Sequence, residues 1–448
     1  MSPLMRADRS GELGQALLTT TLVHYHHSMA DSIIANAIDT QIRSGKFADV
    51  WLNRRFWTTA AVVFCLVALF RGLRLPNQFS STLVLFDYHF GFIKRGLIGA
   101  TFGSIFHLER FTFFCAFSYT FIALLCLLMG VLIHQSDAFR LIGEGEFIAF
   151  FAGSYAVTYL GHLAGYSDII LAVITTGLLL FRSAHWRFIA SVPLCILALL
   201  SHEMFLVVFF PAILLSFAFD SRSPANRSAS SLLPSIYPLI LSLFMVAGTL
   251  RLALHPALSA AQVSVMATRA ASRADHVISS HILTLFQLSA GDNMRIMGEL
   301  FLHDHRFLLL WFVSFATFGL TSIPLVAVSV MALKTRGHRS APRLLSAGVI
   351  CSSLSPLAMN LVGFDFVRWN ALATLTSFLV LLTVTRGGLR VRLPAPLKNL
   401  VILLIACNMA CGEGLMDRAT PHFFPFAESS MHLVHSIAEE GGRMPVPE

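Results

Sequence analysis

Apolar segments long enough to cross a lipid bilayer recur along this chain, and they limit its fold more than any other feature. A membrane-spanning helix needs about 20 mostly apolar residues. Of the 448 residues, 56% are hydrophobic and only 12% are charged. We therefore predict an all-α, polytopic transmembrane bundle of about eleven spans over residues 56–411. The predicted segments are 56–73, 111–133, 147–162, 167–181, 188–200, 203–219, 232–254, 307–333, 344–361, 371–385 and 399–411.

The run 188–219 is too long for one comfortable crossing and short for two. Arg182 and Arg187 precede it, and Arg222 and Arg227 follow it. Because basic residues are retained in cytoplasmic loops, two short spans with both pairs inside are the better interpretation.

The same rule predicts the orientation of the chain in a bacterial inner (plasma) membrane. The basic loops 334–343 and 386–398 are expected in the cytoplasm, as are the amphipathic N-terminal segment 1–55 and therefore the N-terminus. Residues 255–306 are expected to form a small helical extracytoplasmic cap, and 412–448 a C-terminal tail. We interpret 96–106 as a surface or re-entrant helix and not as a crossing. A crossing there would reverse the side of every later loop.

Composition also excludes several functions. The formal net charge of +8 is better explained by basic cytoplasmic loops than by nucleic-acid binding, so no nucleic acid is expected as a partner. The seven cysteines lack the paired spacing of a zinc site, and no metal is expected. No phosphate-binding loop or dinucleotide fingerprint is present, so we expect no cofactor.

Charged residues in apolar surroundings are the candidate functional residues, because a charge against a bilayer is costly unless it is paired. The first cluster contains Asp87, Lys94 and Arg95, with glycines that allow close backbone approach to a ligand. Its carboxylate could accept a proton from a sugar hydroxyl, and Arg95 could hold a phosphate. The alternative is an interfacial anchor in which Asp87 pairs with Lys94 or Arg95.

Two further clusters follow. His202 and Glu203 interrupt an apolar run. His202 could act as a general base, and Glu203 as an alternative base or as a ligand for the acceptor sugar. The alternative is a structural polar pair. Asp365 and Arg368 are three residues apart, a spacing that allows a salt bridge on a helix and would present Arg368 to an anion. Trp369 could lie at the membrane interface or stack on a sugar ring. A purely structural ion pair is the alternative. The remaining polar residues are Asp168, a substrate-binding candidate that can also cap a helix, and His162, a weaker candidate.

The first and third clusters resemble a known group of proteins. Asp87, the run Gly-Phe-Ile-Lys-Arg-Gly-Leu and the later Asp-Phe-Val-Arg-Trp are similar to segments of polytopic proteins of bacterial surface-polysaccharide assembly. These include Wzy-type repeat-unit polymerases and GT-C glycosyltransferases. The resemblance implies glycosyl transfer from a polyprenyl carrier at the outer face, with Arg95 or Arg368 at the donor phosphate. The paired acids frequent in GT-C enzymes are absent here.

We therefore expect an integral membrane enzyme that polymerises polyprenyl-pyrophosphate-linked repeat units for an exopolysaccharide. Asp87, His202 and Glu203 are the catalytic candidates, and Lys94, Arg95, Asp168, Asp365, Arg368 and Trp369 the substrate-binding candidates. Expected partners are the polyprenyl-linked saccharide, membrane lipid and other polysaccharide-assembly proteins. One alternative is a GT-C-type transferase using a polyprenyl-phosphate sugar donor. Another is a transporter or lipid-linked glycan flippase, in which charges would be distributed through the membrane depth.

Overall fold

The computed structural model describes residues 54–90, 93, 95–136, 146–220, 233–253, 258–279, 282–283, 286–335, 342–363, 365–386 and 394–410. The chain divides into the units Met1–Phe56 and Trp57–Glu448, and the account below concerns the second. Nearly all of the predicted amphipathic segment 1–55, together with Lys94 and the tail 412–448, lies outside the described residues.

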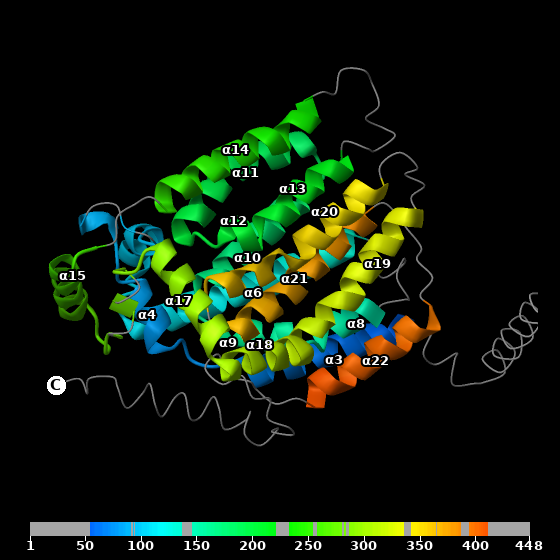
Figure 1. The fold of residues 1–448 in the computed structure, drawn as a ribbon, viewed down its shortest axis with the longest axis horizontal. Helices are drawn as coiled ribbons and strands as arrows, with labels where there is room; N and C mark the ends of the chain where they lie inside the picture. Colours follow the sequence, from blue (N-terminus) through cyan, green and yellow to red (C-terminus); the bar gives the residue numbers. More distant parts are fainter. Residues whose placement is uncertain are drawn as a thin grey trace, which may run out of the picture. The chain divides into compact units, whose positions relative to one another are not determined.

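The described part of the chain is helical and contains no strand, which agrees with the predicted all-α class (Figure 1). Five helical stretches are long and apolar enough to cross a membrane, judged by length and composition: Phe111–Gln135, Ala184–Ser201, His305–Lys334, Arg343–Leu361 and Phe366–Thr385. Five shorter apolar helices accompany them. These features indicate a helical membrane protein.

The helices follow the eleven predicted apolar segments closely. Four of those segments are each divided into two or more helical pieces: 147–162, 203–219, 307–333 and 344–361. The main helices are α3 (Arg54–Gly72), α6 (Phe111–Gln135), α8 (Glu146–Ala152), α9 (Tyr155–His162), α10 (Ser167–Leu180), α11 (Ala184–Ser201), α12 (Phe205–Val208), α13 (Phe210–Asp220), α14 (Leu233–Ala253), α18 (His305–Phe318), η5 (Gly319–Thr321), α19 (Ser322–Thr335), α20 (Pro342–Leu354), η6 (Ser355–Leu361), α21 (Phe366–Thr385) and α22 (Ala395–Ala410).

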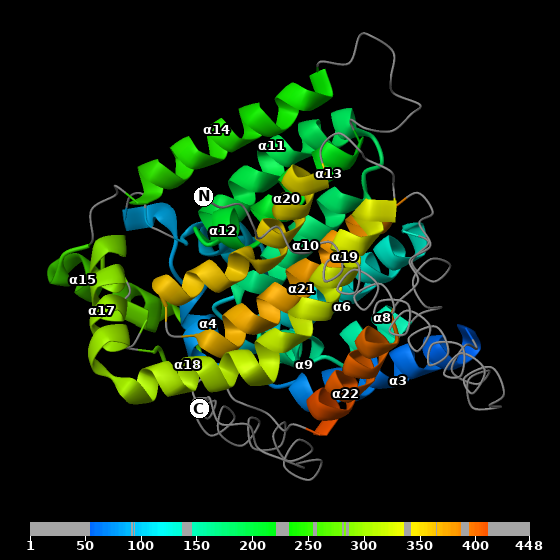
Figure 2. The same ribbon diagram turned by 45° about the vertical axis from the view of Figure 1, so that its right-hand side comes forward.

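Helix α21 lies at the centre, and every one of its residues is buried. It packs against α9, α13, α18, α19 and α20 (Figures 1 and 2). A helix that is apolar on all sides is stable only when other helices surround it. Two of its polar side chains bond to neighbouring elements: the Thr374 hydroxyl lies 2.8 Å from that of Thr321, and Asn370 Nδ2 donates to Ser314 Oγ at 3.0 Å.

Glycine sets the closest helix crossing. A Cβ at Gly161 of α9 would lie 2.6 Å from the carbonyl carbon of Gly72, and a Cβ at Gly72 would lie 1.9 Å from the Thr158 carbonyl oxygen. No side chain fits between these backbones, so α3 and α9 approach each other through glycine.

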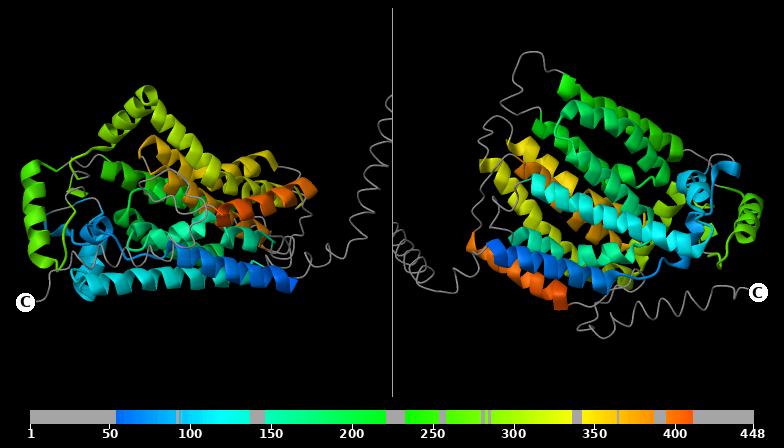
Figure 3. Two further views of the ribbon diagram at one scale, coloured as in Figure 1. Left: turned by 90° about the horizontal axis from the view of Figure 1, so that it is seen from below. Right: turned by 180° about the vertical axis from the view of Figure 1, so that it is seen from behind.

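A helical subassembly lies at the end of the bundle that carries the 202–204 turn (Figures 1 and 3). It contains α4 (Gln78–Leu83), α15 (Ala260–Arg273) and α17 (Ala290–His303). Leu85, Phe86 and Ile93 pack against the apolar face of α15. The segment predicted as a cap therefore contains helices, and α15 packs on the residues that follow α4.

The segment 97–106 forms a short helix of mixed type that ends at His107, whose φ is 50°. At 1.5 Å of rise per residue it extends about 15 Å, half of the hydrocarbon thickness.

Candidate functional site

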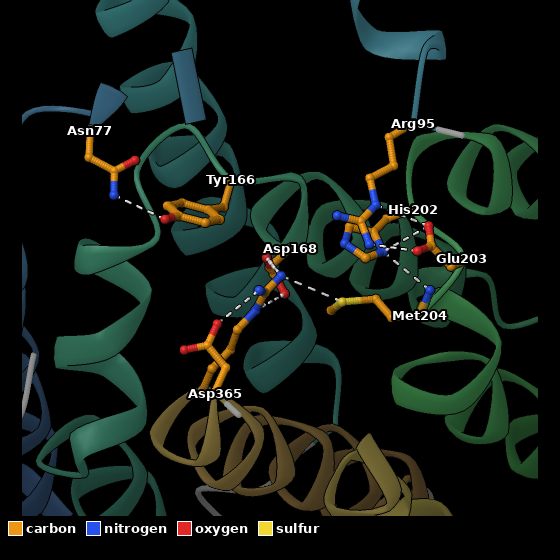
Figure 4. Close-up of polar contacts among 9 residues, drawn as sticks. Asn77, Arg95, Tyr166, Asp168, His202, Glu203, Met204 and Asp365 are labelled. Carbon is orange, nitrogen blue, oxygen red and sulfur yellow. Dashed lines mark hydrogen bonds and ion pairs between the residues drawn. The ribbon is translucent and has the colours of Figure 1, made fainter. Parts of the chain in front are cut away.

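The first charged group forms where α11 ends. The backbone of His202 is extended, with φ −165° and ψ 126°, which stops the helix and begins a turn through Glu203 and Met204 to α12. Arg95 reaches this turn from the segment that follows α4 and the 3₁₀ turn Tyr88–Phe90. Its Nε and Nη2 donate to Glu203 Oε2 at 3.2 Å and Oε1 at 2.6 Å, a bidentate pair (Figure 4).

Arg95 is held in a backbone conformation that disfavours a side chain. Its φ is 62°, and His107 is the only other described non-glycine residue with a positive φ. Such a conformation costs about 1–2 kcal/mol outside glycine and persists only where neighbours enforce it. The next residue, Gly96, is buried against Ile93 and Tyr88, whose side-chain atoms would lie 2.7 and 2.9 Å from an added Cβ. The expectation that glycine here leaves room for a ligand is wrong for Gly96, which makes room for packing.

The electrostatics of this group favour one charge state. Burial opposes ionisation of Glu203, but the Arg95 guanidinium beside it and His202 hold the pKa of that carboxyl well below its ordinary value. Burial, and then the nearby Arg95 charge, lowers the pKa of His202 well below its ordinary value. The backbone N–H of Met204 also donates to His202 Nδ1 at 3.3 Å, which uses that nitrogen as an acceptor. The site therefore holds an ionised acid, a cation and a neutral imidazole.

The second group surrounds Arg368 in the first turn of α21. Its Nε and Nη2 donate to Asp168 Oδ1 at 3.1 Å and Oδ2 at 2.6 Å, and its Nη1 donates to Asp365 Oδ2 at 3.2 Å. The guanidinium also lies 4.9 Å from the Trp369 ring and 5.6 Å from the Tyr166 ring. Asp168 is fully buried, whereas Asp365 retains 28% of its side-chain exposure.

Met204 joins the two groups. Its backbone N–H reaches His202, and its Sδ accepts a long contact of 3.6 Å from Arg368 Nη2 (Figure 4). The structure thus brings together five of the predicted residues, Arg95, Asp168, His202, Glu203 and Arg368, with Asp365 at the edge.

Asp87 belongs to a different contact. Its Oδ2 pairs with Arg273 Nη1 of α15 at 3.0 Å, and its Oδ1 accepts from the His89 backbone N–H. The predicted pairing of Asp87 with Arg95 is therefore wrong, because Arg95 is paired with Glu203, and Lys94 lies outside the described residues. Within the described part of the chain, Asp87 contacts neither charged group.

Trp369 is buried, with 4% exposure, and its ring lies 4.9 Å from the Arg368 guanidinium. Its place at the membrane interface or on a sugar ring stays a prediction. The capping role of Asp168 needs correction. Asp168 does no capping through its side chain, since no side-chain cap is present at the start of α10 and its carboxylate is occupied by Arg368. His162 is buried and ends α9, where its carbonyl oxygen accepts from Arg74 Nε.

Sequence reasoning missed three contacts of this site. Tyr166 lies against Arg368 and accepts a hydrogen bond from Asn77 Nδ2 at 3.0 Å, and burial raises its pKa to about 12. Met204 was missed because methionine in an apolar run carries no polar signal. Arg273 was missed as the partner of Asp87, because the two residues are 186 positions apart in the sequence.

Within the described ranges, no three His, Cys, Asp or Glu side chains gather in a way that could hold a metal ion. The arrangement can instead bind an anion at Arg95, which is 22% exposed and whose Nη1 has no protein partner in the described part of the chain. Comparison with family models, curated proteins and solved structures finds no match for this chain.

Proposed function

We propose that the chain is a bacterial inner-membrane enzyme that polymerises polyprenyl-pyrophosphate-linked repeat units at the outer face. The observation that carries this proposal is the Arg95–Glu203 pair, partly exposed and placed beside a neutral imidazole. Arg95 can take a phosphate oxygen through Nη1, and His202 can accept a proton. Glycosyl transfer from a lipid pyrophosphate requires these two properties close together.

The proposed topology has eleven crossings with the N-terminus in the cytoplasm. Contacts between loops support it, because segments that the predicted topology assigns to the outer side meet at one end of the bundle. Arg95 meets Glu203, Arg368 meets Asp168, and Asp275 Oδ1 accepts from the Phe111 backbone N–H at 2.9 Å.

In the proposed reaction the acceptor hydroxyl attacks the anomeric carbon, and the bond from that carbon to the pyrophosphate oxygen breaks. His202 takes the hydroxyl proton at Nδ1, where the acceptor hydroxyl replaces the Met204 backbone N–H, and Arg95 stabilises the departing pyrophosphate. The bound anion also offsets the Arg95 charge that depresses the His202 pKa, so His202 becomes a stronger base when substrate is present. Glu203 orients Arg95, and Arg368, held by Asp168, contacts the turn that carries His202 through Met204.

A transporter or flippase is less well supported. In the described apolar helices, each acidic, basic or histidine side chain lies within four residues of a helix end. The buried examples include Arg71, Glu146, Asp168, Arg187 and Arg368. A transport path would need polar groups through the membrane depth. A GT-C-type transferase with a polyprenyl-phosphate donor remains the second candidate, since the same Arg95 and His202 chemistry would serve it.

The test replaces Arg95 by Gln in the chromosome and measures surface glycan and lipid-linked intermediates by mass spectrometry. Arg295→Gln is the matched control, because Arg295 lies on α17 with 70% of its side chain exposed. Polymerase activity predicts that complete single repeats accumulate in Arg95→Gln alone, whereas a transferase predicts repeats lacking one sugar. Normal profiles at normal protein levels would refute both enzyme proposals.

A further inference from the structure

The segment that leads to Arg95 is packed against α15. Phe86 and Ile93 precede Arg95 in the sequence, and they are 2% and 1% exposed. Both belong to one apolar cluster with Val263 and Met266 of α15. Since Ile93 lies only two residues before Arg95, a helix distant in the sequence holds the backbone on one side of this arginine.

An ion pair joins α15 to the same segment. Arg273, the last residue of α15, donates through Nη1 to Asp87 Oδ2 at 3.0 Å. The other carboxylate oxygen, Asp87 Oδ1, accepts from the His89 backbone N–H at 2.9 Å and so stabilises the start of the 3₁₀ turn Tyr88–Phe90. Asp87 therefore connects α15 with the turn that comes before Arg95.

The backbone of Arg95 depends on the packing of this turn. A Cβ at Gly96 would lie 2.7 Å from Ile93 Cγ1 and 2.9 Å from Tyr88 Cε1, so no space remains between Gly96 and these side chains. The positive φ of Arg95, 62°, persists only while its neighbours enforce it. If the turn loosens, that φ can relax, and the guanidinium is no longer fixed beside Glu203.

We propose that Asp87 and Arg273 are positioning residues for the substrate pyrophosphate and act through Arg95 without touching the substrate. The inference rests on the anion-binding role that the proposed function gives Arg95. With the ion pair intact, the Arg95 guanidinium is in place before the anion arrives. Without it, ordering the turn and the guanidinium reduces the affinity for the anion. The pair is partly exposed, so its loss has little effect on global stability.

The test measures binding of inorganic pyrophosphate to the full chain in nanodiscs by isothermal titration calorimetry. Asp87→Asn keeps an oxygen for the His89 N–H and removes the charge that holds Arg273. We expect this variant and Arg273→Gln to bind about tenfold more weakly than the wild type. Arg273→Lys keeps a cation for Asp87 and should restore most of the affinity. Arg295→Gln is the matched control, because its side chain on α17 is 70% exposed, and it should bind as the wild type does.

The direction of the Asp87→Asn effect separates the alternatives. If Asp87 acted on the anion only through its charge, removing that charge would tighten binding, which would overturn the proposal. If Asp87 were the catalytic base, its loss would lower the transfer rate and leave pyrophosphate affinity unchanged, which also overturns it. Unchanged affinity in folded Arg273→Gln would have the same meaning.

The Arg95→Gln variant separates this inference from the proposed function. Absence of pyrophosphate binding in the wild type, or equal binding in Arg95→Gln, would refute the anion site and the inference with it. Normal glycan and lipid profiles in Arg95→Gln, with pyrophosphate affinity lost in the Arg95, Asp87 and Arg273 variants, would refute the function and leave the positioning role standing.

Discussion

Removing the buried partner of Arg368 should destabilise the bundle far more than removing the exposed one. Asp168→Ala deletes a fully buried carboxylate that makes two hydrogen bonds to a guanidinium with 10% exposure. Breaking a buried ion pair by removing one partner costs about 3–5 kcal/mol, because the remaining charge is left uncompensated. Asp365→Ala removes one bond to Arg368 from a 28% exposed carboxylate, and the loss of that bond should cost about 1 kcal/mol or less.

The free energy of unfolding can be measured by titrating SDS into mixed micelles and following tryptophan fluorescence. The double variant Asp168→Ala with Arg368→Met supplies the control, because an apolar side chain in place of the stranded cation should recover most of the loss. The reasoning fails if the two single aspartate variants differ by less than about 1 kcal/mol, a difference smaller than the burial argument allows.

Three further predictions concern other parts of the molecule. Gly161→Ala should lower the free energy of unfolding by about 1–3 kcal/mol in the same titration, because its Cβ would meet the α3 backbone. Gly177→Ala is the control: no atom lies within 4 Å of a Cβ added there, so this variant should be neutral or stabilising. Arg273→Gln should release the contact with Asp87 and speed hydrogen exchange in α15 while changing global stability by under about 1 kcal/mol. Wild-type stability should fall as pH drops below about 6.5, since the depressed pKa of His202 means that the unfolded state binds more protons there. The His202→Gln variant should lose less stability over that range, and an equal loss in both proteins would contradict the assignment.

Helix positions could be predicted from the sequence because hydrophobic length is a local property. The segment 232–254, for example, agrees with α14 at Leu233–Ala253. The start of α21 was predicted five residues late, since Arg368 interrupts the apolar run. Its charge is tolerated inside the helix only because Asp168 and Asp365 neutralise it, and hydropathy does not contain that information.

The partners within the site were much harder to predict. Each of the three clusters contributes to the site, because Arg95 pairs with Glu203 and Met204 links that pair to Arg368. The pairings themselves join residues far apart, 200 positions for Arg368 with Asp168 and 186 for Arg273 with Asp87. Without a fixed helix arrangement, each acid had several equally suitable cations.

The location of charge at the helix ends has an electrical consequence. Moving one elementary charge across a membrane potential of 100 mV changes the energy by about 2.3 kcal/mol, but a charge that stays at the edge of the hydrocarbon crosses little of that field. In the proposed orientation the Arg95 and Arg368 groups stay at one edge of the bilayer. Sugar transfer should therefore proceed at the same rate in energised and de-energised vesicles, powered by the bond to the lipid carrier.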